Sequence, residues 1–225
     1  MFIKILKFGG SSVGTPKMIK KAGEIVKIAS KKEKVAVVVS AFQGVTDQLL
    51  KYAKLAVKNG SNLNELKELK NRHLKAVNQL AKSPWPGRQK SKVECQKHVE
   101  NLFQELSAVL NEIQKEKFAS DKNLDLVASF GERLSAYIVA ASIKNAYFVD
   151  ARELVKTDNN FTTASVDFNK TNRRIQNFFR NKKGIPVITG FLGSTSKGET
   201  TTLGRGGSDY TASIFGAALG VKVVE

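Results

Sequence analysis

The opening of the chain constrains the fold more than any other part, because it orders a strand, a glycine-rich loop, a helix and a second strand. Residues 2–8 favour a strand, and residues 9–14 form a loop rich in glycine and serine. Thr15 and Pro16 then supply a helix N-cap and a first helical residue, and apolar side chains recur at helical spacing behind them. Residues 35–39 are a continuous apolar run, typical of a strand covered on both faces. This order predicts an α/β fold with a largely parallel sheet.

The first loop has the composition of a phosphate-binding turn. It is not a P-loop, because Thr15 and Pro16 stand where a lysine and a hydroxyl residue are required. Lys7 instead precedes the loop, at the end of the first strand. A lysine there, beside the backbone amides of Gly9 and Gly10, can neutralise the charge of a phosphate group. The alternative is a surface lysine before a tight turn.

A second glycine-rich stretch lies near residue 205. Residues 204–207 place three glycines around Arg205, and Ser208 and Asp209 follow. Glycine amides at a helix N-terminus favour an anion, and the planar guanidinium of Arg205 suits a carboxylate or a phosphate. Asp209 would repel an anion, so its carboxylate is better suited to hold a lysine, a metal or an ammonium group. We expect Ser208 to cap a helix over 210–219. The alternative to a ligand site is an ordinary glycine-rich turn before that helix.

Two further stretches carry polar groups where a ligand could bind. Ser40 and Thr46 lie in a loop after the second strand, and open α/β sheets bind ligands at the carboxyl ends of their strands. Glu132 lies beside a glycine within an apolar, alanine-rich helical pattern. Each signal is weak by itself, because such residues are common in strand-to-helix turns and on helix surfaces.

The rest of the chain alternates helical and strand patterns. Apolar stripes predict a helical hairpin packed on the sheet over about 46–115, interrupted at 83–87, where Trp85 anchors the tip. His73 and His98 are isolated in lysine-rich surroundings, so we expect neither to bind a metal. The other expected elements are a helix over 121–144, a strand over 146–149, a polar loop over 157–163, a helix over 167–180, a strand over 184–190, a hairpin over 191–203 and the start of a strand over 221–225.

Composition limits the partners and the compartment. The net charge of +17 could indicate nucleic acid, but the lysines are spread along the whole chain, which does not favour a nucleic-acid interface. The single cysteine, Cys95, excludes an intrachain disulfide and fits a reducing compartment. Residues 1–7 are too short and too charged for a signal peptide, and no apolar run approaches the roughly 20 residues that cross a bilayer. We therefore expect a cytoplasmic protein with no membrane partner.

Three motifs together resemble aspartokinase, of the amino acid kinase superfamily. They cover residues 7–14, 129–135 and 200–209, and residues 190–194 match as well. They occur in the order and at the spacing of that family, whose fold is an α/β/α three-layer sandwich with a largely parallel sheet. Ser11 is a departure, because the family usually has threonine there, but the hydroxyl is retained.

The resemblance implies an activity and a role for each site residue. Aspartokinases transfer the γ-phosphoryl group of ATP to the side-chain carboxylate of L-aspartate, the first step towards lysine, threonine and methionine, and Mg²⁺ arrives with the ATP. The implied catalytic residues are Lys7 and Asp209, with Asp209 orienting Lys7. The implied phosphate-binding residues are Lys7, Gly9, Gly10 and Ser11. The implied aspartate-binding residues are Ser40, Thr46, Glu132, Arg205, Gly207 and Ser208. No residue is implied as a direct metal ligand.

The resemblance also implies that residues 1–225 are only the N-terminal, aspartate-binding lobe of such an enzyme. The nucleotide-binding half and the ACT regulatory domains of the family are expected to be absent, and the chain alone is expected to be inactive. A strand at 221–225 would leave a sheet edge that invites a homo-oligomer. Three alternatives stay open: an amino acid kinase for glutamate, acetylglutamate or a nucleotide; a non-catalytic fragment that binds aspartate or serves in assembly; and a nucleic-acid binder.

Overall fold

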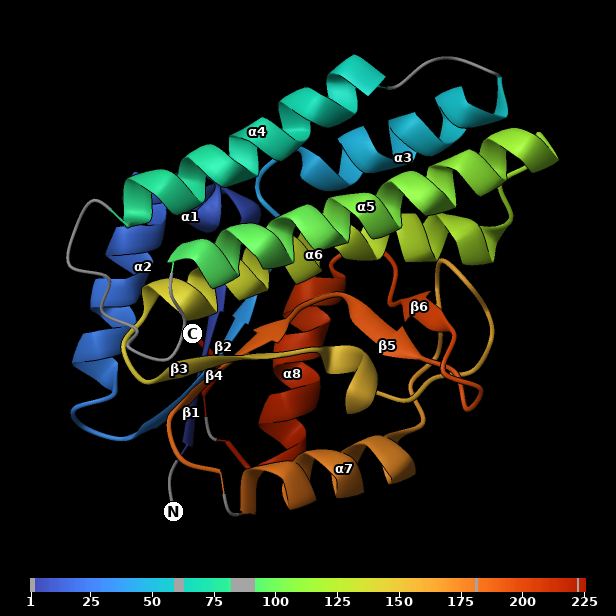
Figure 1. The fold of residues 1–225 in the computed structure, drawn as a ribbon. Helices are drawn as coiled ribbons and strands as arrows, with labels where there is room; N and C mark the ends of the chain where they lie inside the picture. Colours follow the sequence, from blue (N-terminus) through green and yellow to red (C-terminus); the bar gives the residue numbers. More distant parts are fainter. Residues whose placement is uncertain (1–2, 59–62, 82–91, 181, 222) are drawn as a thin grey trace.

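The computed structural model describes residues 3–58, 63–81, 92–180, 182–221 and 223–225 (Figure 1). The strands are β1 (Ile3–Phe8), β2 (Lys34–Val39), β3 (Ala146–Val149), β4 (Ile185–Thr189), β5 (Leu192–Ser194) and β6 (Thr200–Thr202). The helices are α1 (Gly10–Val13), α2 (Pro16–Ala29), α3 (Val45–Val57), α4 (Leu63–Leu80), α5 (Lys92–Glu116), α6 (Asp121–Ser142), α7 (Phe168–Arg180) and α8 (Gly207–Ala218), with a short 3-10 helix at Ala151–Glu153. The expected order of strands and helices is confirmed except at residues 10–13, which form the short helix α1 within the expected loop, and in the two segments over 46–115 and 221–225.

A four-stranded parallel sheet in the order β1-β2-β4-β3 forms the centre of the fold. Its register aligns the last residues of three strands, because Phe8 pairs with Val39 and Val39 pairs with Thr189. The backbone continues this ladder by one residue, with Ser40 donating to Phe8 and Gly190 donating to Val39. The loops that follow β1, β2 and β4 therefore leave the sheet at one edge.

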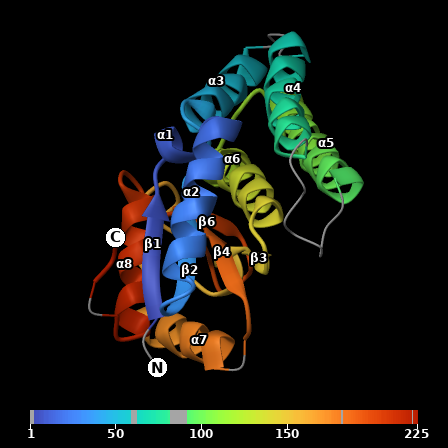
Figure 2. The ribbon, with the colours of Figure 1, turned by 90° about the vertical axis from the view of Figure 1, so that its left-hand side faces the viewer.

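Helices cover both faces of the sheet and make three layers (Figures 1 and 2). Side chains of β2 alternate between two apolar cores: Val37 and Val39 face α2 and α6, whereas Ala36 and Val38 face α7 and α8. Residues 35–39 are all buried, as the continuous apolar run predicts. The arrangement confirms the α/β/α sandwich with a largely parallel sheet.

The segment between β2 and α6 differs from the expected hairpin. It forms three helices, α3, α4 and α5, which contact α6 and α2 rather than lying on the sheet (Figure 2). The physical reason is that α6 already covers the sheet and is buried almost all round between residues 127 and 141. The predicted interruption at 83–87, with Trp85, lies outside the described residues.

The start of α8 corrects the predicted cap. The helix begins at Gly207, and its N-cap is Gly206, whose φ of 75° is left-handed, so Ser208 lies in the first turn and does not cap it. The chain must turn sharply out of the preceding glycine-rich stretch, and glycine adopts that conformation without a steric cost. By contrast, the predicted cap of α2 is confirmed, because Thr15 accepts a hydrogen bond from the amide of Met18.

The segment over 221–225 makes a bridge rather than a named strand. Val224 pairs with Ile5 in parallel, Lys7 donates its amide to the carbonyl of Glu225, and Glu225 donates to Ile5. Val224 and Glu225 therefore lie beside β1, at the edge of the sheet.

Candidate functional site

A cavity of about 660 Å³ lies where β1 and β2 end and α8 begins. The predicted residues that line it are Lys7, Gly10, Ser40, Thr46, Glu132, Arg205, Gly207, Ser208 and Asp209. They come from segments far apart in the sequence, which the parallel register brings to one edge. Gly9 and Ser11 do not line the cavity, and Ser11 is exposed on α1.

Lys7 and Asp209 form an ion pair at the rim of this cavity. The Nζ atom of Lys7 lies 2.8 Å from Oδ1 of Asp209, with 20% of the lysine side chain and 72% of the aspartate side chain exposed. Because Asp209 is largely solvated, the pair adds little to stability, but it holds the ammonium group at the end of β1. The structure thus brings together two residues that the sequence separates by two hundred positions.

The loop after β1 approaches the loop after β2 closely. A Cβ atom on Gly10 would lie 2.9 Å from the carbonyl oxygen of Ala41, so no larger residue fits there without a shift. A Cβ on Gly9 would lie 3.5 Å from Nζ of Lys7, which places the backbone of the loop beside the ammonium group. This combination of a lysine and a close glycine backbone suits a phosphate group.

Glu132 is a buried carboxylate in the cavity wall. It exposes 3% of its surface, its Oε1 atom accepts the amide of Ala41 at 3.3 Å, and its Oε2 atom has no hydrogen-bond partner among the described residues. Burial raises the pKa of Glu132 to about 8, and the Ala41 amide opposes that rise. An unpaired buried carboxylate is costly unless a cation approaches it. An ammonium group is the simplest ligand for this position.

Helix α4 supports the loop that carries Ser40 and leads to Thr46 in the first turn of α3. The Arg72 guanidinium donates to the carbonyl of Gln43 at 3.0 Å, and His73 stacks on Phe42 with ring centroids 4.9 Å apart. His73 is fully buried, which differs from the lysine-rich surroundings predicted for it, and burial lowers its pKa to about 4. Its neutral ring therefore packs in the core and places the Phe42 side of the loop.

Arg205 is exposed and is one of the residues that line the cavity. No hydrogen bond or ion pair joins it to any of the described residues. The backbone around it is closely fitted, because a Cβ on Gly207 would lie 2.6 Å from the ring of Phe191 and one on Gly190 would lie 2.7 Å from Ser208. An unpaired guanidinium can bind a carboxylate through two parallel hydrogen bonds.

Asp125 is a site residue that the sequence patterns missed. It lines the cavity, exposes 2% of its surface and accepts hydrogen bonds from Thr162 and Thr202. Burial raises its pKa, and the bonds from Thr202 and Thr162 oppose the rise. The available signal was its spacing, since Asp125 lies seven residues before Glu132 and two turns of a helix return to the same face.

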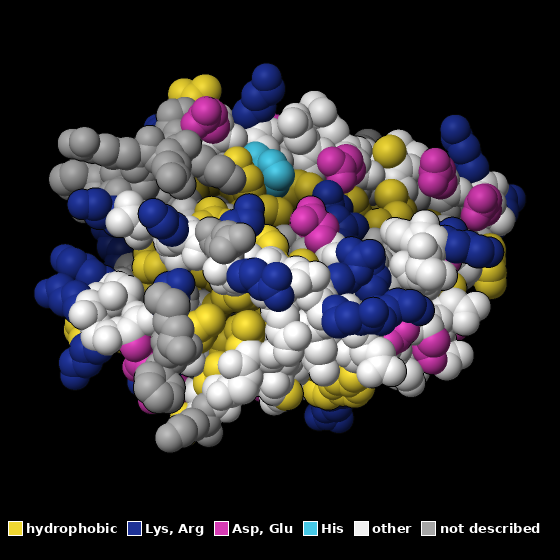
Figure 3. Space-filling model, turned by 90° about the horizontal axis from the view of Figure 1, so that it is seen from below, with side chains coloured by type: hydrophobic (Ala, Val, Ile, Leu, Met, Phe, Trp, Pro, Cys, Tyr) yellow, Lys and Arg dark blue, Asp and Glu magenta, His cyan; other side chains and the backbone are white. Residues whose placement is uncertain are grey.

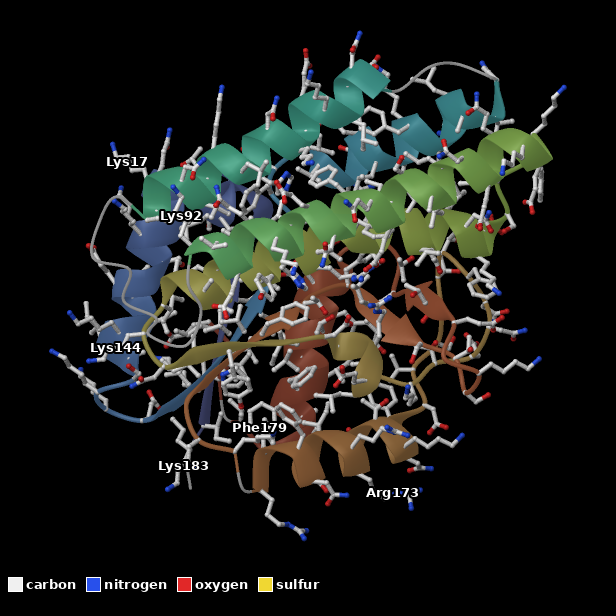
Figure 4. All side chains as sticks on the ribbon, viewed as in Figure 1. Lys17, Lys92, Lys144, Arg173, Phe179 and Lys183 are labelled. Atoms are coloured by element: carbon white, nitrogen blue, oxygen red, sulfur yellow. The ribbon has the colours of Figure 1, made fainter. Side chains whose placement is uncertain are left out.

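A second cavity, of about 860 Å³, lies at the amino ends of the strands. None of the predicted site residues lines it, and its lysines surround the C-termini of α2 and α6, where cations offset the helix dipoles. Lys144, just after α6, is one of them (Figure 4).

Seen from the side of α7, basic and acidic side chains are interspersed over the surface (Figure 3).

The described part of the chain offers neither a metal-ligand cluster nor a membrane span. No group of three or more His, Cys, Asp or Glu side chains there could hold a metal ion, and no helix there is both long and apolar enough to cross a bilayer. Cys95 is buried in α5, in the packing position that its helical pattern indicates.

Comparison with known proteins decides the family. Residues 3–225 match the amino acid kinase family, which is nearly the whole chain. The chain belongs to this family. It is 31% identical to aspartokinase 1 (chloroplastic) of Arabidopsis thaliana over 236 aligned positions, which cover 98% of this chain and 39% of the plant protein.

Solved structures give the same result. Aspartokinase III of E. coli in complex with lysine and aspartate superposes with a TM-score of 0.84 at 27% identity, covering 99% of this chain and 48% of that one. The same enzyme with aspartate and ADP also gives 0.84, at 26% identity, and covers 100% of this chain and 48% of that one. The chain therefore spans less than half the length of these relatives.

Proposed function

We propose that this chain is the acceptor-binding part of an aspartate kinase, which binds L-aspartate in the 660 Å³ cavity. The observation that carries the proposal is that one cavity is lined both by Glu132, a buried carboxylate with one oxygen unpartnered among the described residues, and by Arg205, whose guanidinium has no partner there. An α-amino acid presents an ammonium group and a carboxylate to such a pair. The likeness to aspartokinases supports aspartate as that amino acid.

In the proposed reaction, an oxygen of the substrate's side-chain carboxylate forms a bond to the γ-phosphorus of ATP. The bond from that phosphorus to the bridging oxygen breaks, and the products are ADP and 4-phospho-L-aspartate. The attacking carboxylate has a free pKa near 4, so it is ionised at pH 7 and needs no general base. The chain must therefore position an anion beside a polyanion and neutralise charge.

Each residue has a task in this proposal. Glu132 binds the ammonium group, Arg205 binds the α-carboxylate, and Ser40 and Thr46 donate hydroxyl groups to carboxylate oxygens. Lys7 neutralises the charge that develops on the transferring phosphoryl group, and Asp209 holds Lys7 in place.

The nucleotide and its metal fit the loop after β1. Lys7, with the close backbone of Gly9 and Gly10, would face the terminal phosphate, whereas Ser11 is exposed on α1 and is a weaker candidate. Gly207 and Ser208 would contribute the first turn of α8 to an anion. Mg²⁺ would enter on the phosphates and supply charge neutralisation there. We also propose a cytoplasmic location, although the plant relative is chloroplastic.

Calorimetry with residues 1–225 tests the proposal. We expect saturable binding of L-aspartate, with weaker binding of L-glutamate and N-acetyl-L-glutamate. Arg205→Lys should weaken aspartate by roughly tenfold or more, because lysine cannot form the bidentate fork. Arg173→Lys is the matched control, because Arg173 is exposed on α7 and points away from the sheet (Figure 4). Preference for another amino acid would assign the chain to a different acceptor, and equal binding by wild type and Arg205→Lys would remove Arg205 from the site.

A second candidate is a chain that binds aspartate without catalysing transfer. The observation that favours it is the length comparison, since the chain spans 39% of the plant relative. Both candidates predict aspartate binding without ADP formation by residues 1–225 alone, so this one would be supported only if ADP formation were also missing in a longer chain that includes a nucleotide-binding half.

A further inference from the structure

Asp125 joins three segments that are distant in the sequence. It belongs to the first turns of α6, and its Oδ2 atom accepts the backbone amides of Thr162 and Thr202, each at 2.9 Å. Its Oδ1 atom accepts the hydroxyl of Thr202 at 2.6 Å. Both carboxylate oxygens are thus used, and the partners belong to the polar loop at Thr162 and to the end of strand β6 at Thr202, both of which line the cavity.

The loop at Thr162 and the end of β6 at Thr202 are also tied to each other around the Asp125 carboxylate. Ala164 donates its amide to the carbonyl of Thr202 at 3.0 Å. Thr162 has a φ of 71°, an uncommon conformation for a β-branched residue, which persists only where surrounding contacts impose it. A Cβ on Gly204 would lie 3.5 Å from the carbonyl oxygen of Thr162. The bond from Asp125 to the Thr162 amide is one contact that holds this conformation against the glycine-rich stretch.

Only two residues separate Thr202 from Arg205. Leu203 donates its amide to Phe191, Gly204 has a φ of 73°, and Gly206 is the N-cap of α8. Because Arg205 has no partner of its own among the described residues, its position depends on the backbone on either side. Asp125 anchors one side, and the packing of α8 anchors the other.

The same helix also carries Glu132. Glu132 lies seven positions after Asp125, which corresponds to about two helical turns or roughly 10 Å along the axis. Both line the cavity. Helix α6 therefore carries Glu132, which is proposed to bind the ammonium group. Through Asp125, the same helix also holds the segment that leads to Arg205, which is proposed to bind the α-carboxylate.

We propose that Asp125 is a positioning residue that sets the spacing between Glu132 and Arg205, and so makes the site select an α-amino acid. This inference rests on the proposed function and assigns the source of its specificity. The simpler explanation, a buried aspartate that only stabilises the fold, predicts a uniform loss of binding or of stability.

A comparison of two ligands separates these explanations. β-Alanine is aspartate without its α-carboxylate, so it keeps the groups for Glu132 and the phosphoryl site and loses the group for Arg205. The wild-type chain should bind L-aspartate more tightly than β-alanine. Asp125→Asn keeps the shape but removes the charge, so the charge-assisted bond with the Thr202 hydroxyl becomes a neutral one in which the NH₂ group donates, and the variant should lower that affinity ratio by roughly tenfold. Arg205→Lys should lower the same ratio.

The control is Asp121→Asn, one turn earlier on α6 and exposed, which should leave the ratio unchanged. The inference would be overturned if Asp125→Asn left the affinity ratio unchanged, whether it weakened the binding of both ligands equally or of neither. Should that variant fail to fold by circular dichroism, Thr202→Val decides. It removes the hydroxyl bond but keeps both backbone bonds, so it should lower the ratio by a smaller factor, and no change would count against Asp125.

Amide hydrogen exchange gives a readout that does not depend on aspartate. In Asp125→Asn, exchange should accelerate at Thr202, Leu203 and Gly207 and remain unchanged in the second half of α6. If the wild type bound neither ligand, the proposed function would fail while this measurement still judged the anchor. Unchanged exchange at those three amides would refute the anchoring role.

Discussion

Binding of aspartate is expected to release a proton from Glu132. This carboxyl group is buried with one oxygen unpartnered, and burial raises its pKa from 4.5 to about 8. In the empty site at pH 7, it is therefore only roughly 10% ionised. An ammonium group beside it favours the charged form, so the pKa must fall in the complex.

The magnitude follows from the size of that shift. Ionising Glu132 at pH 7 costs about 1.4 kcal/mol, so aspartate should bind roughly tenfold more weakly at pH 7 than well above pH 8. Between pH 6 and 7 the association constant should rise by about tenfold, and at pH 7 about 0.9 proton should be released per aspartate bound.

Calorimetry in two buffers of different ionisation enthalpy measures the released proton directly. Glu132→Gln should bind aspartate more weakly and should lose both the proton release and the pH dependence. Glu105→Gln is the control, because Glu105 is more than half exposed and pairs with Arg133 outside the cavity. Tight binding with no proton release at pH 7 would refute the reasoning, since it would mean that Glu132 is already charged or does not meet the ammonium group.

Three other predictions concern the ion pair, the buried histidine and turnover. A double-mutant cycle with Lys7→Met and Asp209→Asn, measured by urea unfolding, should give a coupling of about 0.5 kcal/mol because Asp209 is solvated, and a coupling above roughly 2 kcal/mol would make the pair a structural one. His73 has a pKa of about 4 against 6.5 unfolded, so its contribution to stability is complete above pH 6.5 and is lost as the pH falls through 4. Between pH 6.5 and pH 4, the free energy of unfolding should therefore fall by up to about 3 kcal/mol because of His73, and His73→Phe should abolish that fall. An unchanged dependence of unfolding on pH would contradict the burial of the ring. Residues 1–225 should form no ADP above background in a coupled assay. Lys7 with its loop is the only phosphate-binding set that we assign in the described residues, and a misplacement of ATP by about 1 Å can lower the rate ~100-fold. Turnover at the rate of a full-length aspartokinase would show that other residues hold ATP.

Local patterns predicted most of the fold because they report local physics. The continuous apolar run at 35–39 identified a strand covered on both faces, and Thr15 with Pro16 identified a helix start, as the structure confirms. The start of α8 was misplaced because a serine is a good cap anywhere, whereas the left-handed Gly206 takes that position here. Three helices in place of a hairpin reflect competition for the sheet, whose face α6 already occupies.

The sequence by itself determined which chemical groups are available and roughly which turns carry them: a lysine before a glycine loop, an arginine within three glycines, and a glutamate in an apolar helix. It also determined the family, through motifs whose order and spacing are specific. Only the tertiary structure decided that Lys7 pairs with Asp209, that Glu132 is left without a partner for one oxygen, and that Asp125 holds the loop before Arg205. The reason is that spacing along a chain constrains only neighbours within a helix or strand. The parallel register of β1, β2 and β4 and the packing of α6 bring distant residues to one cavity. Burial in that cavity then sets the charge of those residues.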